Sequence, residues 1–193
     1  MSRISLVQKE QASPEVKELF QKIEDNRARV INLYKVVSHS PHVVRDFIKL
    51  GNSLIGRTEL SPKLRELTIM RVAKLCHSEY EWTQHVLVAL EAGVSQEELD
   101  AINSWKESDS FTEEERTVLQ YVDEVARNVE VTDETFTALS QYLNERNIVE
   151  LTLAIGWWGM LARLLVPLEV EIDEQSASST GDLIGRRTAT GPK

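Results

Sequence analysis

The stretch of sequence that decides the fold is residues 60–95, which read LSPKLRELTIMRVAKLCHSEYEWTQHVLVALEAGVS. Within it, Ser61 and Pro62 are residue types that begin a helix, and the apolar residues that follow recur at helical spacing. A second helix is predicted over 79–92, because Gly93 stands where a helix usually ends. Two successive helices without a strand pattern between them indicate an all-α core.

Helix-starting residues recur outside this stretch. Ser-Pro pairs, and Ser or Thr followed three residues later by Glu, precede further segments of helical apolar spacing. No segment alternates with the period of a strand. The chain is therefore predicted to be all-α, a multi-helix bundle of about nine helices. Besides the two above, we expect helices over 14–25, 30–38, from 41, 96–103, 112–128, 133–144 and 147–165, the last capped by Asn147 with Glu150.

The composition is that of one well-cored domain. The chain has 193 residues, a hydrophobic fraction of 41% and a formal net charge of −9. This acidic balance argues against nucleic-acid binding, because phosphate neutralisation needs clustered Lys and Arg. The single cysteine excludes an internal disulfide framework. We expect one domain over 1–172, with its core motif at 60–95, and a flexible tail over 173–193, which is rich in Ser, Thr and Gly.

Two segments bear on location and assembly. The first residues contain no apolar run, so no export signal is predicted and the cytoplasm is the expected location. Residues 148–168 are apolar but carry Glu150 and Arg163, whereas a membrane-spanning helix needs about 20 apolar residues with few charges. We expect a buried core or interface helix here and no membrane partner. Because Trp157 and Trp158 add more apolar surface than a monomer is expected to bury, we predict a homo-oligomer, either a dimer, a trimer or a hexamer.

Polar residues that could carry chemistry gather on the two helices of the quoted stretch. Glu66 lies among apolar residues of the first helix, where a carboxylate is either solvated, ion-paired or part of a functional site. On the second helix, Ser78, Glu81 and His85 follow at spacings of three and four and form one stripe. We expect this stripe at the edge of the buried face, with Trp82 in the apolar stripe that faces the core. An ordinary surface pair and a catalytic pair both fit this spacing.

A metal or phosphate site is not predicted. The chain has no His-Glu-x-x-His pattern, and Ser78 is a poor ligand beside Glu81 and His85. It also lacks a glycine-rich phosphate loop and a Gly-x-Ser-x-Gly nucleophile motif. No metal is therefore expected.

These residues carry a resemblance to a known family. Residues 60–73, 78–85 and 92–95 resemble the carboxymuconolactone decarboxylase family, which is related to the alkylhydroperoxidase D-like proteins. The similarity covers residues 15–170, and its specific part is 66–85. The resemblance implies an all-α fold, assembly as trimers or hexamers, and a site between helices near a subunit interface.

The resemblance implies that the peroxidase branch of this superfamily uses a Glu, a Cys-x-x-Cys pair and a His. With His85 matched to that His, the Glu falls on Glu66 and the two cysteine positions fall on Ser78 and Glu81. Cys76, the lone cysteine, has no partner, whereas peroxide reduction by this route needs two thiols. An antioxidant activity of the alkylhydroperoxidase type is therefore a disfavoured alternative.

The Ser-x-x-Glu-x-x-x-His form resembles the decarboxylase branch, which acts on a small lactone carboxylate without a metal or organic cofactor. The resemblance implies a lyase or isomerase-type enzyme for a small lactone, carboxylate or aromatic-derived compound, which delivers a proton to an enolate-like carbanion. A non-catalytic oligomeric small-molecule-binding protein is a further alternative. The implied catalytic residues are His85 as the acid–base group, Glu66 or Glu81 to orient it or exchange its proton, and Tyr80 to donate a hydrogen bond to an oxyanion. For substrate binding, we expect Arg65 or Arg71 to receive a carboxylate, with Ser78 and Trp82 as further contacts.

Overall fold

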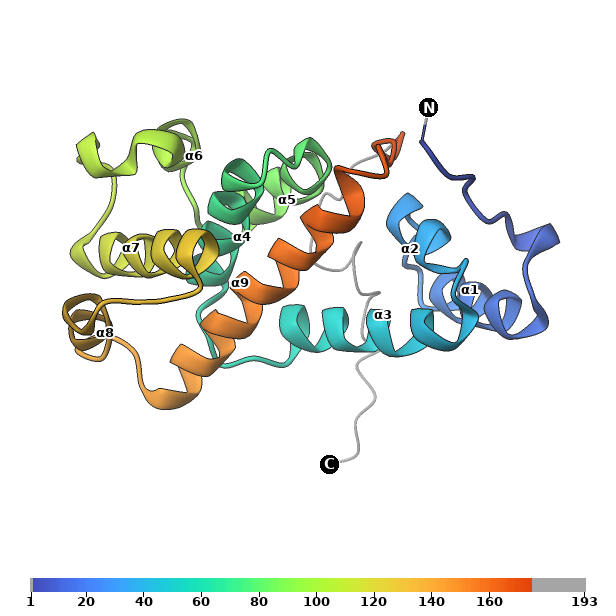
Figure 1. Ribbon diagram of the computed structural model, residues 1–193, viewed down its shortest axis with the longest axis horizontal. Helices are drawn as coiled ribbons and strands as arrows, with labels where there is room; N and C mark the ends of the chain where they lie inside the picture. The colour runs from blue at the N-terminus through green and yellow to red at the C-terminus, as the bar shows by residue number, and fades with distance from the viewer. Residues whose placement is uncertain (1, 175–193) are drawn as a thin grey trace.

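A computed structural model describes residues 2–174 of the chain (Figure 1). These residues fold into nine α-helices and two short 3₁₀ helices joined by loops, without a strand. The predicted all-α class and the expected number of helices are thus confirmed. The elements are η1 (Lys9–Gln11), α1 (Pro14–Asp25), α2 (Asn32–Val37), α3 (Pro41–Gly56), α4 (Pro62–Leu75), α5 (Glu79–Glu91), α6 (Gln96–Ala101), η2 (Ile102–Glu107), α7 (Glu113–Asn128), α8 (Asp133–Leu139) and α9 (Glu145–Leu165).

Helix α4 is the centre of the fold. It packs against α5, α7 and α9, and every residue from Leu64 to Ala73 is buried. Helix α9 crosses the middle of the view diagonally, with α6, α7 and α8 on one side and α1 and α2 on the other (Figure 1). The buried part of α4 includes Arg65, Glu66 and Arg71, so these charges must find partners inside the fold.

Both capping boxes that the sequence predicts are present. Ser95 and Glu98 exchange side-chain and backbone hydrogen bonds at the start of α6, and Thr112 and Glu115 do so at the start of α7. Lys63 forms ion pairs with both glutamates, at 2.8 Å to Glu98 and 2.6 Å to Glu115. The first turn of α4 is thereby tied to the starts of two other helices.

The start of α9 differs from the prediction. The N-cap is Asn144 rather than Asn147, because the side-chain oxygen of Asn144 accepts the backbone N–H of Asn147 at 2.9 Å. Asn147 therefore lies within the first turn. Glu150, expected to complete the cap, instead accepts the backbone N–H groups of Glu59 and Leu60, both at 2.8 Å, and so fixes the connection between α3 and α4.

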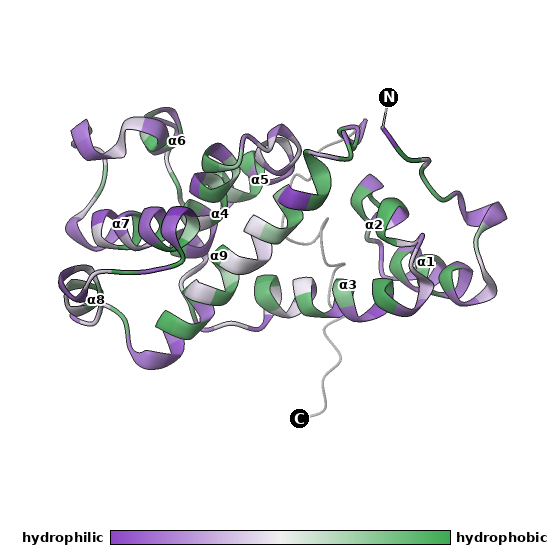
Figure 2. Cartoon of the chain, in the orientation of Figure 1, coloured by the Kyte–Doolittle hydropathy of each residue, from purple (hydrophilic) through white to green (hydrophobic). Residues whose placement is uncertain are grey.

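Helix α9 is long and apolar enough to cross a membrane by length and composition, but 56% of its most apolar window is buried within the described fold. It packs against α4, α7 and α3, which is the environment of a core helix. The ring of Trp157 lies against Gly51 of α3, where a Cβ atom would be 3.1 Å from it. Much of α9 has the colour of hydrophobic residues in Figure 2, and three of its hydrophobic side chains, Val149, Leu153 and Met160, are exposed.

The ordered body extends past the predicted domain boundary at residue 172. Asp173 accepts hydrogen bonds from the backbone of Asn32 in α2 and from the side chains of Tyr80 and Gln84 in α5. The expected tail therefore cannot begin at 173. The remainder of that prediction, over 175–193, lies outside the described residues.

Candidate active site

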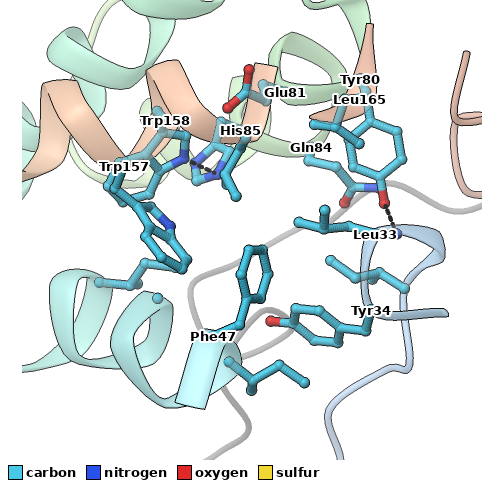
Figure 3. A pocket seen from close by; sticks show the side chains of 15 residues that line it. Leu33, Tyr34, Phe47, Tyr80, Glu81, Gln84, His85, Trp157, Trp158 and Leu165 are labelled. Atoms are coloured by element: carbon cyan, nitrogen blue, oxygen red, sulfur yellow. Dashed lines mark hydrogen bonds between the residues drawn. The ribbon is translucent and has the colours of Figure 1, made fainter. Parts of the chain in front are cut away.

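An interior cavity lies between α2, α3, α5 and α9 (Figure 3). The cavity has a volume of about 50 Å³, which is room for a ligand of a few heavy atoms before any side chain moves. Most of its wall is aliphatic or aromatic. These apolar residues are Ile31, Leu33, Tyr34, Phe47, Ile48, Gly51, Ile55, Trp157, Trp158, Leu161 and Leu165.

The polar wall of the cavity comes from α5. Tyr80, Glu81, Gln84 and His85 share one face of this helix, and each is at most 6% exposed. The stripe of Ser78, Glu81 and His85 was predicted at the edge of the buried face, but it is buried, since each of these residues is at most 6% exposed. Trp82, expected to face the core, is only half-buried. The polar face turns inward because partners on other elements satisfy most of its polar atoms.

His85 is oriented by a buried carboxylate from α4. Its Nδ1 lies 2.9 Å from Oε2 of Glu66, which is fully buried. The other oxygen of Glu66 accepts a hydrogen bond from Nε of Arg65 at 3.1 Å, so the guanidinium compensates the buried negative charge. Of the two glutamates expected to orient His85, it is Glu66 that contacts the ring.

The second ring nitrogen of His85 faces Trp158 of α9. The indole Nε1–H of Trp158 donates to Nε2 of His85 at 3.3 Å, and the two rings meet edge to face (Figure 3). An indole nitrogen can only donate, so Nε2 must be the acceptor and the ring proton must sit on Nδ1, where it faces Glu66. The imidazole therefore presents an electron pair, rather than a proton, toward the cavity wall.

Glu81 is a buried carboxyl group whose two oxygens have no hydrogen-bond partner within the described residues. The side chain lines the cavity, and the residue is 3% exposed. Burial raises the pKa of Glu81 to about 8, against a smaller lowering effect of the Ser78 hydroxyl. Glu81 is therefore a neutral carboxylic acid at neutral pH and can donate a proton.

Tyr80, expected to donate to an oxyanion, is engaged by the chain itself. Its hydroxyl donates to Oδ2 of Asp173 and accepts the backbone N–H of Leu33 at 3.2 Å. Gln84 donates to the same Asp173 oxygen at 3.0 Å. Burial, followed by the nearby Asp173 charge, raises the pKa of Tyr80 well above its ordinary value, so this hydroxyl stays protonated.

Neither arginine expected to receive a substrate carboxylate lines this cavity. Arg65 is 5% exposed and donates to Glu66. Arg71 makes a bidentate pair with Asp123 of α7, at 2.6 and 2.8 Å, and also donates to the carbonyl of Ile102 at 2.9 Å. The guanidinium of Arg71 therefore joins α4, α7 and η2.

The two other expected substrate-binding residues also lie elsewhere. Ser78 is the N-cap of α5, and its hydroxyl faces the backbone N–H of Glu81 at 3.5 Å. Trp82 lies under Lys74, whose Nζ is 3.7 Å from the centre of one of its rings. Both line a separate outer groove rather than the cavity of His85.

The environment of Cys76 does not favour a reactive thiolate. It is free and half-buried at the end of α4, and burial raises the pKa of its thiol above the ordinary value. Within the described residues, no group of three or more His, Cys, Asp and Glu side chains is arranged to hold a metal ion.

Sequence reasoning missed three residues of this site. Gln84 lies on the same helical stripe as Tyr80 and Glu81, so its spacing was a usable signal. Trp158 was expected only as apolar surface, although an indole N–H needs an acceptor when it is buried. Asp173 had no local signal, because its partners lie 141, 93 and 89 residues away in the chain.

Part of the chain is similar to a known protein family. Residues 41–124 match the model of the carboxymuconolactone decarboxylase family. A curated relative, the uncharacterized protein YnjA of Escherichia coli (strain K12), is 27% identical over 115 residues. That match covers 59% of this chain and 63% of the relative, less than two thirds of its length.

Two solved structures share the fold. An uncharacterized peroxidase-related protein from Ralstonia eutropha JMP134, with the alkylhydroperoxidase AhpD core, is 15% identical with a TM-score of 0.77 and covers 90% of this chain and 93% of that one. A cysteine-to-alanine variant of the debrominase Bmp8 in complex with 2,3,4-tribromopyrrole is 20% identical with a TM-score of 0.71 and covers 90% and 95%. Identities this low establish the fold alone. The segment 41–124, which contains both His85 and its Glu66 partner, thus matches the carboxymuconolactone decarboxylase family model, and the chain has the alkylhydroperoxidase D-like fold.

Proposed function

We propose that this protein is a cofactor-free lyase or isomerase-type enzyme that transfers a proton at a carbon atom of a small, mostly apolar compound held in the cavity. One observation carries the proposal: α5 brings two different proton-handling groups to the same buried wall. His85 offers an unprotonated nitrogen, and Glu81 is a carboxyl group that burial keeps neutral. Acid and base set apart by their environments are typical of general acid–base catalysis.

The proposed base is Nε2 of His85. Glu66 fixes the proton on Nδ1 and stabilises the positive ring that forms when Nε2 takes up a second proton. The hydrogen bond from Trp158 to Nε2 is long, at 3.3 Å, and so is weak enough for a substrate group to replace it.

The proposed acid is Glu81. In a decarboxylation, the bond between the carbon and the carboxylate breaks, carbon dioxide leaves, and the electron pair stays on the carbon, delocalised into a neighbouring carbonyl. The Glu81 proton then moves to that carbon, and the carboxylate regains a proton from water. In an isomerisation, His85 instead removes a proton from the substrate and Glu81 returns one.

Cys76 supports this proposal over a thiol-dependent antioxidant activity. The pKa of its thiol is raised by burial, so the reactive thiolate is depleted at neutral pH. A resolving thiol is lacking as well, because Cys76 is the only cysteine in the sequence.

The test is a turnover screen with small lactones, enol lactones and 3-oxo carboxylates, followed by proton NMR. For a substrate that is isomerised, we expect His85→Ala to lower kcat/KM by about 10²–10⁴-fold, which is the usual size of general acid–base catalysis; for one that is decarboxylated, we expect Glu81→Gln to do so. The matched control is His42→Ala, because that side chain is 94% exposed and lies outside the cavity. Turnover by the tested variant that equals turnover by His42→Ala would refute the proposal. Ligand binding without any turnover by the wild type would favour a binding protein instead.

A further inference from the structure

The carboxylate of Asp173 is held by three donors from two helices that precede it in the chain. Its Oδ1 accepts the backbone N–H of Asn32 at 2.9 Å. Its Oδ2 accepts the side-chain amide of Gln84 at 3.0 Å and the hydroxyl of Tyr80. Since Tyr80 also accepts the backbone N–H of Leu33, its proton is directed to the carboxylate. These donors form a cradle that fits a carboxylate group.

This cradle adjoins the cavity of His85. Tyr80 and Gln84 line the cavity (Figure 3), and both also bind Asp173. Among the described residues that line the cavity, none is an arginine or lysine. An acidic group on a ligand would therefore find its donors at the cradle rather than deeper in the cavity.

An outer groove lies on the other side of Asp173. Asn32 and Asp173 line this groove, and Ile31 is shared between the groove and the cavity. Arg29 and Lys35 line the groove together with the carboxylates of Glu171, Asp173 and Glu174. Asp173 thus stands between this outer groove and the cavity that holds the proposed acid and base.

We propose that the backbone N–H of Asn32, the hydroxyl of Tyr80 and the amide of Gln84 form a carboxylate-binding subsite, which Asp173 fills until a small carboxylate ligand displaces it. The ligand's carboxylate takes the place of the Asp173 side chain, and its apolar part extends toward His85. The inference rests on the proposed function only in taking this cavity as the ligand site, and its test reads binding rather than turnover.

The first test is chemical rescue of Asp173→Ala, with acetate as the probe. We expect acetate to raise the melting temperature of this variant by about 2–4 °C over the same concentration of sodium chloride or acetamide. The wild type should respond much less, because acetate must compete with Asp173 for the subsite. Glu174→Ala, which removes a neighbouring exposed carboxylate, is the matched control and should respond as the wild type does. An equal effect of acetate and chloride on Asp173→Ala would overturn the inference.

The second test measures the affinity for benzoate by calorimetry. Asp173→Ala, or Asp173→Asn if the first variant does not fold, should bind benzoate at least tenfold more tightly than the wild type does. Benzamide should bind both proteins equally, and adding Tyr80→Phe should remove most of the gain. Unchanged benzoate affinity in both variants would contradict the subsite. If no substrate is ever turned over while acetate rescue holds, the proposed function fails and this inference stands.

Discussion

The Glu66→Ala variant is expected to lose about 3–5 kcal/mol of the free energy of unfolding. The side chain is fully buried, and its two oxygens face Nδ1 of His85 and Nε of Arg65. Removing it leaves a buried guanidinium without its counter-charge and a ring N–H without an acceptor. Urea unfolding followed by circular dichroism measures the loss.

Two further variants show whether the loss comes from the uncompensated charge. Glu79→Ala removes an exposed carboxylate from α5 and should change stability by less than about 0.5 kcal/mol. The double variant Arg65→Met/Glu66→Leu replaces the whole ion pair by apolar side chains and should recover part of the lost stability. A loss below about 1 kcal/mol for Glu66→Ala would mean that Glu66 is not the buried partner described above.

Glu81→Gln is expected to increase stability at neutral pH, whereas Glu66→Ala decreases it. The pKa of Glu81 rises from 4.5 to about 8 on burial, so between these values the folded protein keeps a proton that the unfolded chain releases. The wild type is therefore stabilised by this group below pH 4.5 and loses that contribution as the pH rises toward 8. The neutral Gln side chain does not titrate, so the variant has no such loss. The free energy of unfolding of Glu81→Gln relative to the wild type should therefore grow by roughly 3 kcal/mol between pH 5 and pH 7.5.

The same variant should lose activity while it gains stability at neutral pH. A carboxamide cannot donate a proton to a carbanion, so kcat should fall by about 10²-fold or more. Unfolding curves at pH 5 and 7.5, together with turnover at pH 7.5, measure both effects. Glu79→Gln on the same helix is the control for both. A stability difference that does not depend on pH would contradict the burial of an unpartnered carboxyl at this position.

The helices were predictable because their signals are local. Ser13 with Pro14 precedes α1, and the capping boxes of Ser95 and Thr112 form as the spacing predicted, since each involves residues only three positions apart. The start of α9 was misplaced because Asn144 and Asn147 both qualify as caps, and only the three-dimensional structure shows which side chain accepts the bond.

The candidate site was less predictable because burial and pairing depend on distant segments. The spacing of Glu81 and His85 places them on one face of α5, but it does not say that this face points inward. That orientation depends on partners from α4, α9 and the segment after α9. Arg71 shows the same limit, since its partner Asp123 lies 52 residues away and turns an expected ligand into a structural ion pair.

The protonation of His85 tests the central claim of an oriented base most directly. Two-dimensional ¹H–¹⁵N NMR of the full-length protein, labelled with ¹⁵N in its histidine rings, reports which ring nitrogen carries the proton at pH 7. His85 should show a protonated Nδ1, held by Glu66, and an unprotonated Nε2 that accepts from Trp158, with assignment by comparison with His85→Gln. A proton on Nε2, alone or with one on Nδ1, would contradict the account.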